Sequence, residues 1–381
     1  MDWPETCIHS LFYNALVKTW DVIIIGAGII GLSLAISLRK QGLRVLIVER
    51  GEPGREASHA AAGMLVGSGA EIPPPLRVLA EESARLYPEF VHELEDESGN
   101  RVDLRDQGTI LLSSDGSSPE SAARLSSEQL SWLEPALAVA GRGRPRLHES
   151  REIAESGEVT AAYLSERSVD PRALVAAAIK AAHHREVDIS SGTEVKGLLA
   201  SEGRVTGVQT EKTSYSSTIV VNCAGAWAGC IAPHRFPVRP VKGQMLAVVG
   251  GPVLKHVVRS AKVYLVPRSD WRLVIGSTLE DAGYNKQTSV NTIQQLFHAA
   301  IELAPGLSES KVHEAWAGLR PGTPDDLPIL GETSTSGYFI ATGHFRDGIL
   351  LAPVTAQVMT KLVLGSSPGY DLAHFASSRF Q

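Results

Sequence analysis

Apolar residues near the N-terminus form a short unbroken run that is followed by a helical pattern. Residues 21–25 are mostly β-branched, which is typical of a parallel strand buried on both faces. Residues 29–41 have the pattern of a helix that Gly42 ends, and residues 43–48 form a second apolar run. The pattern predicts a strand, a helix and a second strand of one parallel sheet.

The same order returns near the C-terminus. A short apolar run covers 338–341, a loop with Gly343 follows, and an apolar helix is predicted from around Gly348 to about residue 364. Strand, glycine-containing loop and helix therefore occur at both ends of the chain. We infer that both ends build one discontinuous domain.

Apolar and polar positions alternate in the middle of the chain. Between about 236 and 279 the alternation predicts an antiparallel sheet, with strands over 244–249, 261–267 and 272–278. Further strands are predicted over 193–199, 204–210 and 218–223, and further helices over 76–97, 119–133, 171–183 (with Asp170 as N-cap) and 290–304.

These patterns predict an α/β fold, in which a discontinuous Rossmann-like nucleotide-binding domain carries an inserted antiparallel-sheet α+β substrate domain. We expect the nucleotide-binding domain over 20–85, 156–235 and 319–381, and the substrate domain over 86–155 and 236–318, with 1–19 as an N-terminal extension.

A glycine fingerprint joins the first strand to the first helix. Gly26 suits a tight turn, Gly28 lets a pyrophosphate approach the backbone, and Gly31 lets helix and strand pack closely. The helix N-terminus offers unpaired N–H groups to phosphates, and Glu49, at the end of the second strand, can accept hydrogen bonds from a ribose. The fingerprint predicts dinucleotide binding, with NAD and FAD both open and a glycine turn without a ligand as the alternative.

Composition excludes several classes of protein. The chain has 381 residues, 36 Lys and Arg against 42 Asp and Glu, and a formal net charge of −6, which argues against a nucleic-acid or anionic-membrane binder. Cys7, Cys223 and Cys230 are too few for a disulfide scaffold and form no Cys-x-x-Cys zinc pair, so we expect no metal and a reducing, cytoplasmic setting. Residues 1–19 do not resemble a signal peptide, and no membrane span is predicted.

Two arginines lie in apolar, glycine-rich segments, where a cation needs an anionic partner. For Arg320 we favour the carboxylate of a substrate, and for Arg346 an internal pair; Asp325, Asp326 and Asp347 are the internal candidates. Tyr264 alternates with apolar neighbours, so it belongs either to the core or to the same carboxylate site.

Six segments carry a resemblance to a known family. They are Gly26–Gly31, Ala60-Ala-Ala-Gly-Met64, Pro240-Val-Lys-Gly-Gln244, Tyr264-Leu-Val-Pro-Arg268, Trp316-Ala-Gly-Leu-Arg-Pro-Gly-Thr323 and Gly343-His-Phe-Arg-Asp-Gly-Ile-Leu-Leu-Ala-Pro353. From about residue 20 to 365 the chain resembles the amino-acid and amine oxidases of the D-amino-acid oxidase superfamily, and within it the glycine oxidases of thiamine biosynthesis.

The resemblance implies noncovalently held FAD, because no cysteine follows Cys230. With the fingerprint glycines Gly26, Gly28 and Gly31, the implied FAD contacts are Ile29, Ile30, Glu49, Arg50, Ala57, Ser58, Ala62, Gly63, Met64, Val195, His344, Phe345, Arg346, Asp347, Gly348, Ile349 and Leu350.

The resemblance also implies the chemistry. Arg320, Tyr264 and Arg346 are the catalytic residues and bind the substrate carboxylate, and hydride transfer from the substrate Cα to flavin N5 gives an imine, then glyoxylate (or another 2-oxo acid) and ammonia. Dioxygen as acceptor yields hydrogen peroxide, and the protein is expected to be a homotetramer.

Two residues depart from the glycine-oxidase pattern. Lys262 and Leu279 replace His and Met near the substrate, so the preferred small amine or D-amino acid stays open. The alternatives are a dehydrogenase that passes electrons to a quinone or a partner subunit, a flavin-binding subunit without catalysis, and a nicotinamide dehydrogenase.

Overall fold

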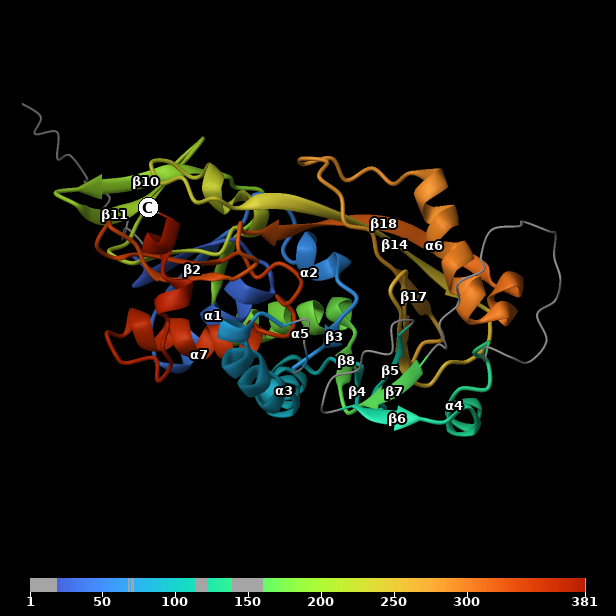
Figure 1. Cartoon of the computed structure of the whole chain (residues 1–381). Coiled ribbons are helices and arrows are strands. Elements are labelled where there is room, and N and C mark those ends of the chain that lie inside the picture. Colours follow the sequence, from blue (N-terminus) through green and yellow to red (C-terminus); the bar gives the residue numbers. More distant parts are fainter. Residues whose placement is uncertain (1–18, 68, 70–71, 114–121, 139–159, 381) are drawn as a thin grey trace, which may run out of the picture.

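Two large sheets and the helices packed on them make up the part of the chain that can be described. The computed structural model describes residues 19–67, 69, 72–113, 122–138 and 160–380. In Figure 1, α1 (Ile29–Lys40) and α7 (Ala352–Val363) lie on the left with the first sheet, and α6 (Val290–Leu303) lies on the right with the second. The predicted α/β fold with a Rossmann-like part is confirmed.

The first sheet has six strands and is parallel except at one edge. Its order is β19 (Ile329–Glu332), β20 (Tyr338–Thr342), β13 (Val220–Asn222), β1 (Val22–Ile25), β2 (Val45–Val48) and β9 (Asp188–Ser190). Only β19 runs antiparallel to its neighbour. The two ends of the chain therefore share one sheet, as the repeated pattern predicted.

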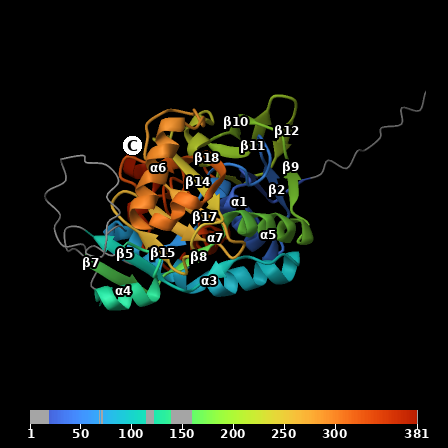
Figure 2. The same ribbon diagram turned by 90° about the vertical axis from the view of Figure 1, so that its right-hand side faces the viewer.

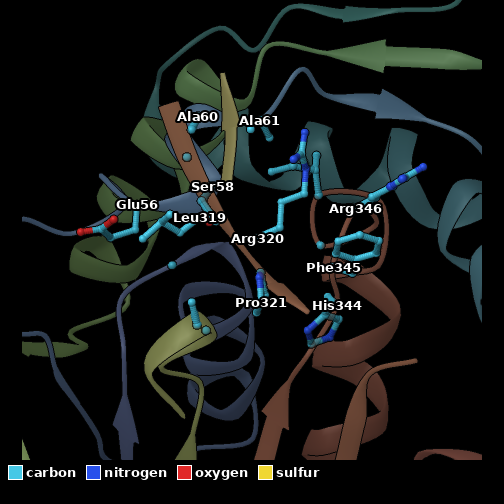
Figure 3. Close-up of a pocket in the computed structure, with 18 of the residues that line it drawn as sticks. Glu56, Ser58, Ala60, Ala61, Leu319, Arg320, Pro321, His344, Phe345 and Arg346 are labelled. Atoms are coloured by element: carbon cyan, nitrogen blue, oxygen red, sulfur yellow. The ribbon is translucent and has the colours of Figure 1, made fainter. Parts of the chain in front are cut away.

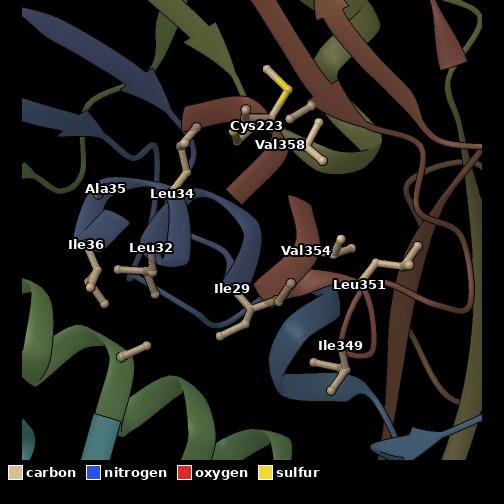
Figure 4. Close-up of a cluster of buried hydrophobic side chains, with 14 of the residues drawn as sticks. Ile29, Leu32, Leu34, Ala35, Ile36, Cys223, Ile349, Leu351, Val354 and Val358 are labelled. Carbon is tan, nitrogen blue, oxygen red and sulfur yellow. The ribbon is translucent and has the colours of Figure 1, made fainter. Parts of the chain in front are cut away.

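Both faces of this sheet are covered, which explains the unbroken apolar runs. Val22 and Ile24 belong to the core shared with α1, α7, α3 (Arg77–Ser98) and α5 (Pro171–His184), whereas Ile23 and Ile25 belong to a core shared with a three-stranded sheet. That small sheet consists of β10 (Val195–Ser201), β11 (Arg204–Thr210) and β12 (Ser214–Ser216). Figure 4 shows α1 and α7 side chains in the first of these cores.

The second sheet has eight strands. Its order is β18 (Lys311–Gly322), β14 (Arg239–Val249), β17 (Leu273–Gly276), β16 (Tyr264–Pro267), β15 (Val257–Arg259), β5 (Thr109–Ser113), β7 (Thr160–Leu164) and β6 (Ala123–Leu125). All neighbours are antiparallel except β15 and β5. Figure 2 shows α6 crossing this sheet, with which it shares an apolar core.

Smaller elements connect the two sheets. A short sheet consists of β3 (Met64–Leu65), β8 (Arg167–Val169) and β4 (Leu104–Arg105). The helix α2 (Ala57–Ala60) precedes β3, and the 3₁₀ helix η2 (Gly225–Cys230) follows β13. Other short helices are α4 (Ser127–Leu133), η1 (Pro74–Leu76), η3 (Pro305–Glu309), η4 (Ala373–Phe375) and η5 (Ser377–Phe380).

Several elements and strand pairings cross the predicted domain boundaries. Strand β7 pairs with β5 in the eight-stranded sheet, although it lies within the range 156–235 that was predicted for the nucleotide-binding domain. The predicted boundaries at 85/86 and 318/319 cut α3 and β18, because one helix and one strand continue through each of them. The division into domains otherwise stays a prediction.

Two helices begin later than predicted. The helix expected over 119–133 begins at Ser127, because Ser126 and Gln129 form a capping box there, and β6 precedes it. The helix expected from Gly348 begins at Ala352, where Pro353 suits the first turn. The N-terminal extension and Cys7, as well as the end of the 86–155 range, lie outside the described residues. No helix in the described part of the chain combines the length and the apolar character that crossing a membrane requires.

Candidate active site

A cavity of about 620 Å³ lies where the two large sheets meet. Its lining includes the carboxyl ends of β1, β2 and β20, where nucleotide ligands bind in open parallel sheets. It also includes residues of β14, β16 and β18 from the second sheet. In Figure 3, Glu56 lies on the left of the view, Phe345 and Arg346 lie on the right, and Ser58 and Arg320 lie between them. The cavity therefore reaches from the glycine fingerprint to the two predicted arginines.

The glycine fingerprint forms a tight turn at the N-terminus of α1. Gly26 has φ +104°, and a Cβ there would lie 2.6 Å from the Cys223 carbonyl oxygen, so only glycine fits. The Ile29 N–H donates to Ser58 Oγ at 3.0 Å. The Glu49 carboxylate accepts the Ala27 N–H and the Gly51 N–H, both at 2.8 Å. These contacts hold the turn and the acidic side chain at the edge of the cavity.

The small residues after α2 line the cavity because the second sheet holds their backbone. Trp316 Nε1 donates to the Ala60 carbonyl at 3.1 Å, and the buried Arg268 donates to the Ala62 carbonyl. A Cβ at Gly318 would lie 2.4 Å from the Ala60 Cβ, so β18 and α2 touch. The small side chains of this segment therefore allow α2 and β18 to pack closely beside the cavity.

Arg320 is a cation in the cavity wall whose side chain is largely buried. Its Nη1 donates to the Thr278 carbonyl at 3.1 Å and its Nη2 to Ser277 Oγ at 2.7 Å. No carboxylate of the described residues forms an ion pair with it, and Asp325 pairs instead with Arg379 at 2.8 Å. Burial, together with the charge of Arg346, lowers the pKa of Arg320. The guanidinium thus lacks the internal partner that was its alternative.

Tyr264 lies next to this guanidinium and lines the cavity. Burial raises the pKa of its phenol, which therefore stays protonated and can donate a hydrogen bond at neutral pH. A Cβ at Gly276 would lie 2.6 Å from the Tyr264 hydroxyl. Tyr264 thus packs against a small apolar core and also lines the cavity. Its position is therefore compatible with both expectations, a core residue and a residue beside Arg320.

The loop 343–349 forms the wall beside Arg320. The Phe345 N–H donates to the Pro321 carbonyl at 3.1 Å, and the Arg346 guanidinium lies 5.1 Å from the Phe345 ring centroid. No ion pair joins Arg346 to a carboxylate of the described residues, so the internal pair favoured for it is not observed. His344 is buried, its Nε2 lies 3.1 Å from Thr355 Oγ1, and burial lowers its pKa to about 3.

Nearly all predicted cofactor and substrate residues line the cavity. Gly31 and Leu350 do not line it. At Gly31 a Cβ would lie 2.1 Å from the Gly26 carbonyl oxygen. Leu350 is buried, and its carbonyl accepts a hydrogen bond from the Ser83 hydroxyl at 2.6 Å. Both act in packing because they face the core. The residues in the cavity wall are Gly26, Gly28, Ile29, Ile30, Glu49, Arg50, Ala57, Ser58, Ala62, Gly63, Met64, Val195, Tyr264, Arg320, His344, Phe345, Arg346, Asp347, Gly348 and Ile349.

Both residues that depart from the glycine-oxidase pattern also line the cavity. Lys262 forms an ion pair with Glu302 at 3.0 Å, and Leu279 is 57% exposed. Two sets of contacts in the cavity wall were not predicted. The Arg50 guanidinium lies 3.5 Å from the ring centroid of Trp227, and Ser277 and Thr278 bind Arg320. The small residues before Trp227 could have indicated a close approach to a ligand, but no feature of the sequence distinguished Ser277 from other serines.

The family follows from comparison with known proteins. The family model of FAD-dependent oxidoreductases (DAO) matches residues 21–362. The chain belongs to this family. It is 36% identical over 374 residues to a bifunctional protein ThiO/ThiG of Trichormus variabilis, covering 95% of this chain and 55% of that protein, and 33% identical to a glycine oxidase of Pseudomonas aeruginosa, covering 93% and 98%. A crystal structure of glycine oxidase from Geobacillus kaustophilus has a TM-score of 0.85 at 30% identity and covers 95% of this chain and 99% of that one.

The chain spans about half the length of the first curated relatives that it matches. The residues of the cavity fit FAD, the cofactor that the family's description names. The turn at Gly26 leaves no room for a side chain, Glu49 ends the second strand, and the cavity continues past the small residues 57–64 to the arginines. In the described part of the chain, no group of three or more His, Cys, Asp or Glu could hold a metal ion.

Proposed function

We propose that this DAO-family protein oxidises the Cα–N bond of glycine or of another small amine or D-amino acid. The observation that carries the proposal is Arg320, a largely buried cation in the cavity wall that no carboxylate of the described residues neutralises. An unpaired buried charge is costly, so this arrangement favours an anionic ligand. When bound, FAD supplies the acceptor for the hydrogen and the two electrons that leave the substrate.

The protein's own contribution is to orient the substrate. Arg320 offers a planar guanidinium that suits a carboxylate, and the Tyr264 hydroxyl can donate to the same group. Arg346 adds positive charge from the loop 343–349. Fixing the carboxylate at this end aims the neighbouring carbon along the cavity, so rate acceleration comes from positioning and electrostatics.

The finer parts of the proposal rest on the resemblance to glycine oxidases and on the relatives' names. They comprise an imine that hydrolyses to glyoxylate and ammonia, dioxygen as acceptor with hydrogen peroxide as product, a role in thiamine biosynthesis, and a homotetramer in the cytoplasm. The alternative is a dehydrogenase that passes electrons to a quinone or a partner subunit. Peroxide formation in air with stoichiometric loss of substrate supports the oxidase, and flavin reduction without peroxide supports the dehydrogenase.

The test is anaerobic mixing of the FAD-loaded protein with glycine, sarcosine and D-alanine, followed by flavin absorbance. We expect at least one of them to bleach the flavin. In Arg320→Ala, loss of charge-assisted hydrogen bonds worth about 1.5–3 kcal/mol should raise the substrate dissociation constant by about tenfold to a hundredfold, with FAD content unchanged.

Arg239→Ala is the matched control, because Arg239 lies on β14 with a 58% exposed side chain. It should bind substrate like the wild type. Absence of bleaching by all three amines, or equal loss of FAD and of substrate affinity in Arg320→Ala, contradicts the proposal.

A further inference from the structure

A cluster of polar side chains lies behind Arg320. We call Lys242, Gln244, Thr278 and Glu280 the 242–280 cluster. Lys242 and Gln244 are buried, at 5% and 1% exposed, and of the four residues only Thr278 lines the cavity. These side chains therefore do not touch a ligand in the cavity, and packing alone does not account for two polar side chains buried on one strand.

Glu280 is the centre of this cluster. Its Oε1 accepts hydrogen bonds from Gln244 Nε2 at 2.8 Å and from the Thr278 hydroxyl, and its Oε2 lies 3.5 Å from Lys242 Nζ. Two backbone hydrogen bonds of 2.9 Å, one in each direction, also join residues 242 and 280. Burial opposes ionisation of Glu280, but the hydrogen bonds from Thr278 and Gln244 and the charge of Lys242 outweigh it and lower its pKa.

The cluster ends on the group that holds Arg320. The Thr278 hydroxyl accepts the Gln244 N–H at 2.9 Å while it donates to Glu280, so residue 278 is fixed from both sides. The carbonyl of the same residue accepts Arg320 Nη1 at 3.1 Å, and the hydroxyl of the preceding Ser277 accepts Nη2. The orientation of the guanidinium thus depends on where the segment 277–280 lies.

Strand β14 also constrains the position of the Arg320 side chain. Residue 241 is the partner of Arg320 in the register of β14 and β18. A Cβ at Gly243 would lie 2.3 Å from Arg320 Nη1, so any side chain there would displace the guanidinium. In the segment Pro240-Val-Lys-Gly-Gln244, Gly243 therefore leaves room for the guanidinium of Arg320. Lys242 and Gln244 bind Glu280 and Thr278, which hold the residues that contact Arg320.

We propose that Glu280 is a positioning residue that, through Thr278, fixes Arg320 in the orientation that binds the substrate carboxylate. The proposal rests on the proposed function for the carboxylate. Glu280 acts on Arg320 indirectly, because Glu280 does not line the cavity. Removing its carboxylate takes away the acceptor of the Thr278 hydroxyl, which keeps only the Gln244 N–H as a donor to it, and leaves Lys242 Nζ with the Gln287 carbonyl at 2.6 Å.

The experiment compares Glu280→Ala and Glu280→Gln with the wild type, all loaded with FAD. The probe is acetate, and its dissociation constant is measured from the perturbation of the flavin absorption spectrum. We expect acetate binding to weaken about tenfold or more in Glu280→Ala and less in Glu280→Gln, which keeps one acceptor oxygen. With the preferred amine, KM should rise more than kcat falls, a split that general loss of structure would not produce.

Asp281→Asn is the control, because Asp281 is the sequence neighbour, its side chain is 82% exposed, and its nearest cationic atom lies 3.8 Å away. It should bind acetate like the wild type. If Glu280→Ala does not fold, the smaller change in Glu280→Gln decides. Wild-type acetate affinity in the folded Glu280 variants overturns the inference.

A crystal structure of Glu280→Ala separates this inference from the proposed function. We expect the Arg320 guanidinium to leave the Thr278 carbonyl. If the wild type binds neither acetate nor any amine but Arg320 still moves in the variant, the proposed function fails and the positioning role stands. If Arg320 keeps its place in the variant, the positioning role is wrong.

Discussion

His344 illustrates how one buried side chain makes stability depend on pH. Burial lowers its pKa to about 3 from the ordinary 6.5, so the folded protein keeps the imidazole neutral. Between these two values an unfolded chain takes up a proton that the folded protein does not, and the free energy of unfolding falls as pH falls. The expected slope from this group is at most about 1.4 kcal/mol per pH unit.

We predict that His344→Gln removes this part of the acid sensitivity. Glutamine does not titrate, and its amide can still reach the Thr355 hydroxyl, which lies 3.1 Å from His344 Nε2. The measurement is chemical denaturation of the wild type and the variant at pH 7.5, 5.5 and 4.5 with FAD in excess. The difference between the two proteins should change by more than 1 kcal/mol from pH 5.5 to 4.5. Parallel pH profiles would show that His344 is protonated in the folded protein.

At the scale of single residues, the sequence indicated functional candidates where a charged side chain lies among apolar residues. Arg320 stood out as a cation among apolar residues and glycines, and it lies in the cavity wall without a carboxylate partner. Ser277 and Glu280 could not be predicted, because a serine and a glutamate after a strand look like ordinary surface residues. Their roles depend on long-range contacts, of Ser277 with Arg320 and of Glu280 with Gln244.

At the scale of the element, β18 holds the segment after α2 against the cavity. The indole N–H of Trp316 donates to the Ala60 carbonyl, and the Arg172 guanidinium lies 4.7 Å from the centroid of the same ring. Trp316→Phe removes the hydrogen bond and keeps an aromatic ring. A neutral hydrogen bond contributes about 0.5–1.5 kcal/mol, so we expect FAD to dissociate about twofold to tenfold faster.

The rate is measured as the increase in flavin fluorescence after dilution. Trp132→Phe is the matched control, because Trp132 is 81% exposed and does not line the cavity. Unchanged FAD release in Trp316→Phe, or an equal increase in both variants, would mean that this contact does not support the cofactor segment.

Elements with a strong local signal were predicted well. The β-branched run of β1 and the Asp170-Pro171 start of α5 lie where the pattern placed them, because burial on two faces and helix capping are encoded within a few residues. Strand β6 was missed because its three residues are half exposed or exposed and therefore carry no apolar pattern. The parallel pairing of β15 with β5 joins residues far apart in sequence, so no local pattern could indicate it.

At the scale of the whole molecule, the domain boundaries were the least predictable feature. Strand β7 lies between segments of the parallel sheet in sequence, but it pairs with β5. Which sheet a strand joins depends on long-range pairing rather than on its own residues. The glycine fingerprint predicted a dinucleotide and Arg320 a substrate carboxylate, because each motif presents a group that needs a ligand, and residues of both motifs line the same cavity.

The loop 281–289 before α6 contacts the cavity wall at Trp227 and Glu56, and its Gln287 carbonyl accepts Lys242 Nζ of the 242–280 cluster at 2.6 Å. The Tyr284 ring stacks on Trp227, with ring centroids 5.3 Å apart, and Arg50 lies over the same indole. Lys286 forms an ion pair with Glu56 at 3.1 Å. Arg50, Glu56 and Trp227 line the cavity, so this loop braces residues that would hold the nucleotide end of FAD.

We therefore predict that Tyr284→Ala releases FAD about twofold to tenfold faster, since an aromatic pair is worth about 0.5–1.5 kcal/mol beyond its buried area. The affinity for acetate should change less than FAD release, because Tyr284 does not line the cavity and its side chain contacts Trp227, Ala226 and Cys230 rather than Arg320. A double-mutant cycle with Trp227→Ala isolates the stack from other effects of either change. If the two changes act additively on FAD release, the stack contributes nothing to it, and the loop supports the cavity wall through other contacts, such as the ion pair of Lys286 with Glu56 and the hydrogen bond from the Tyr284 hydroxyl to the Ala226 carbonyl. If they couple, the stack of Tyr284 on Trp227 helps to retain the cofactor.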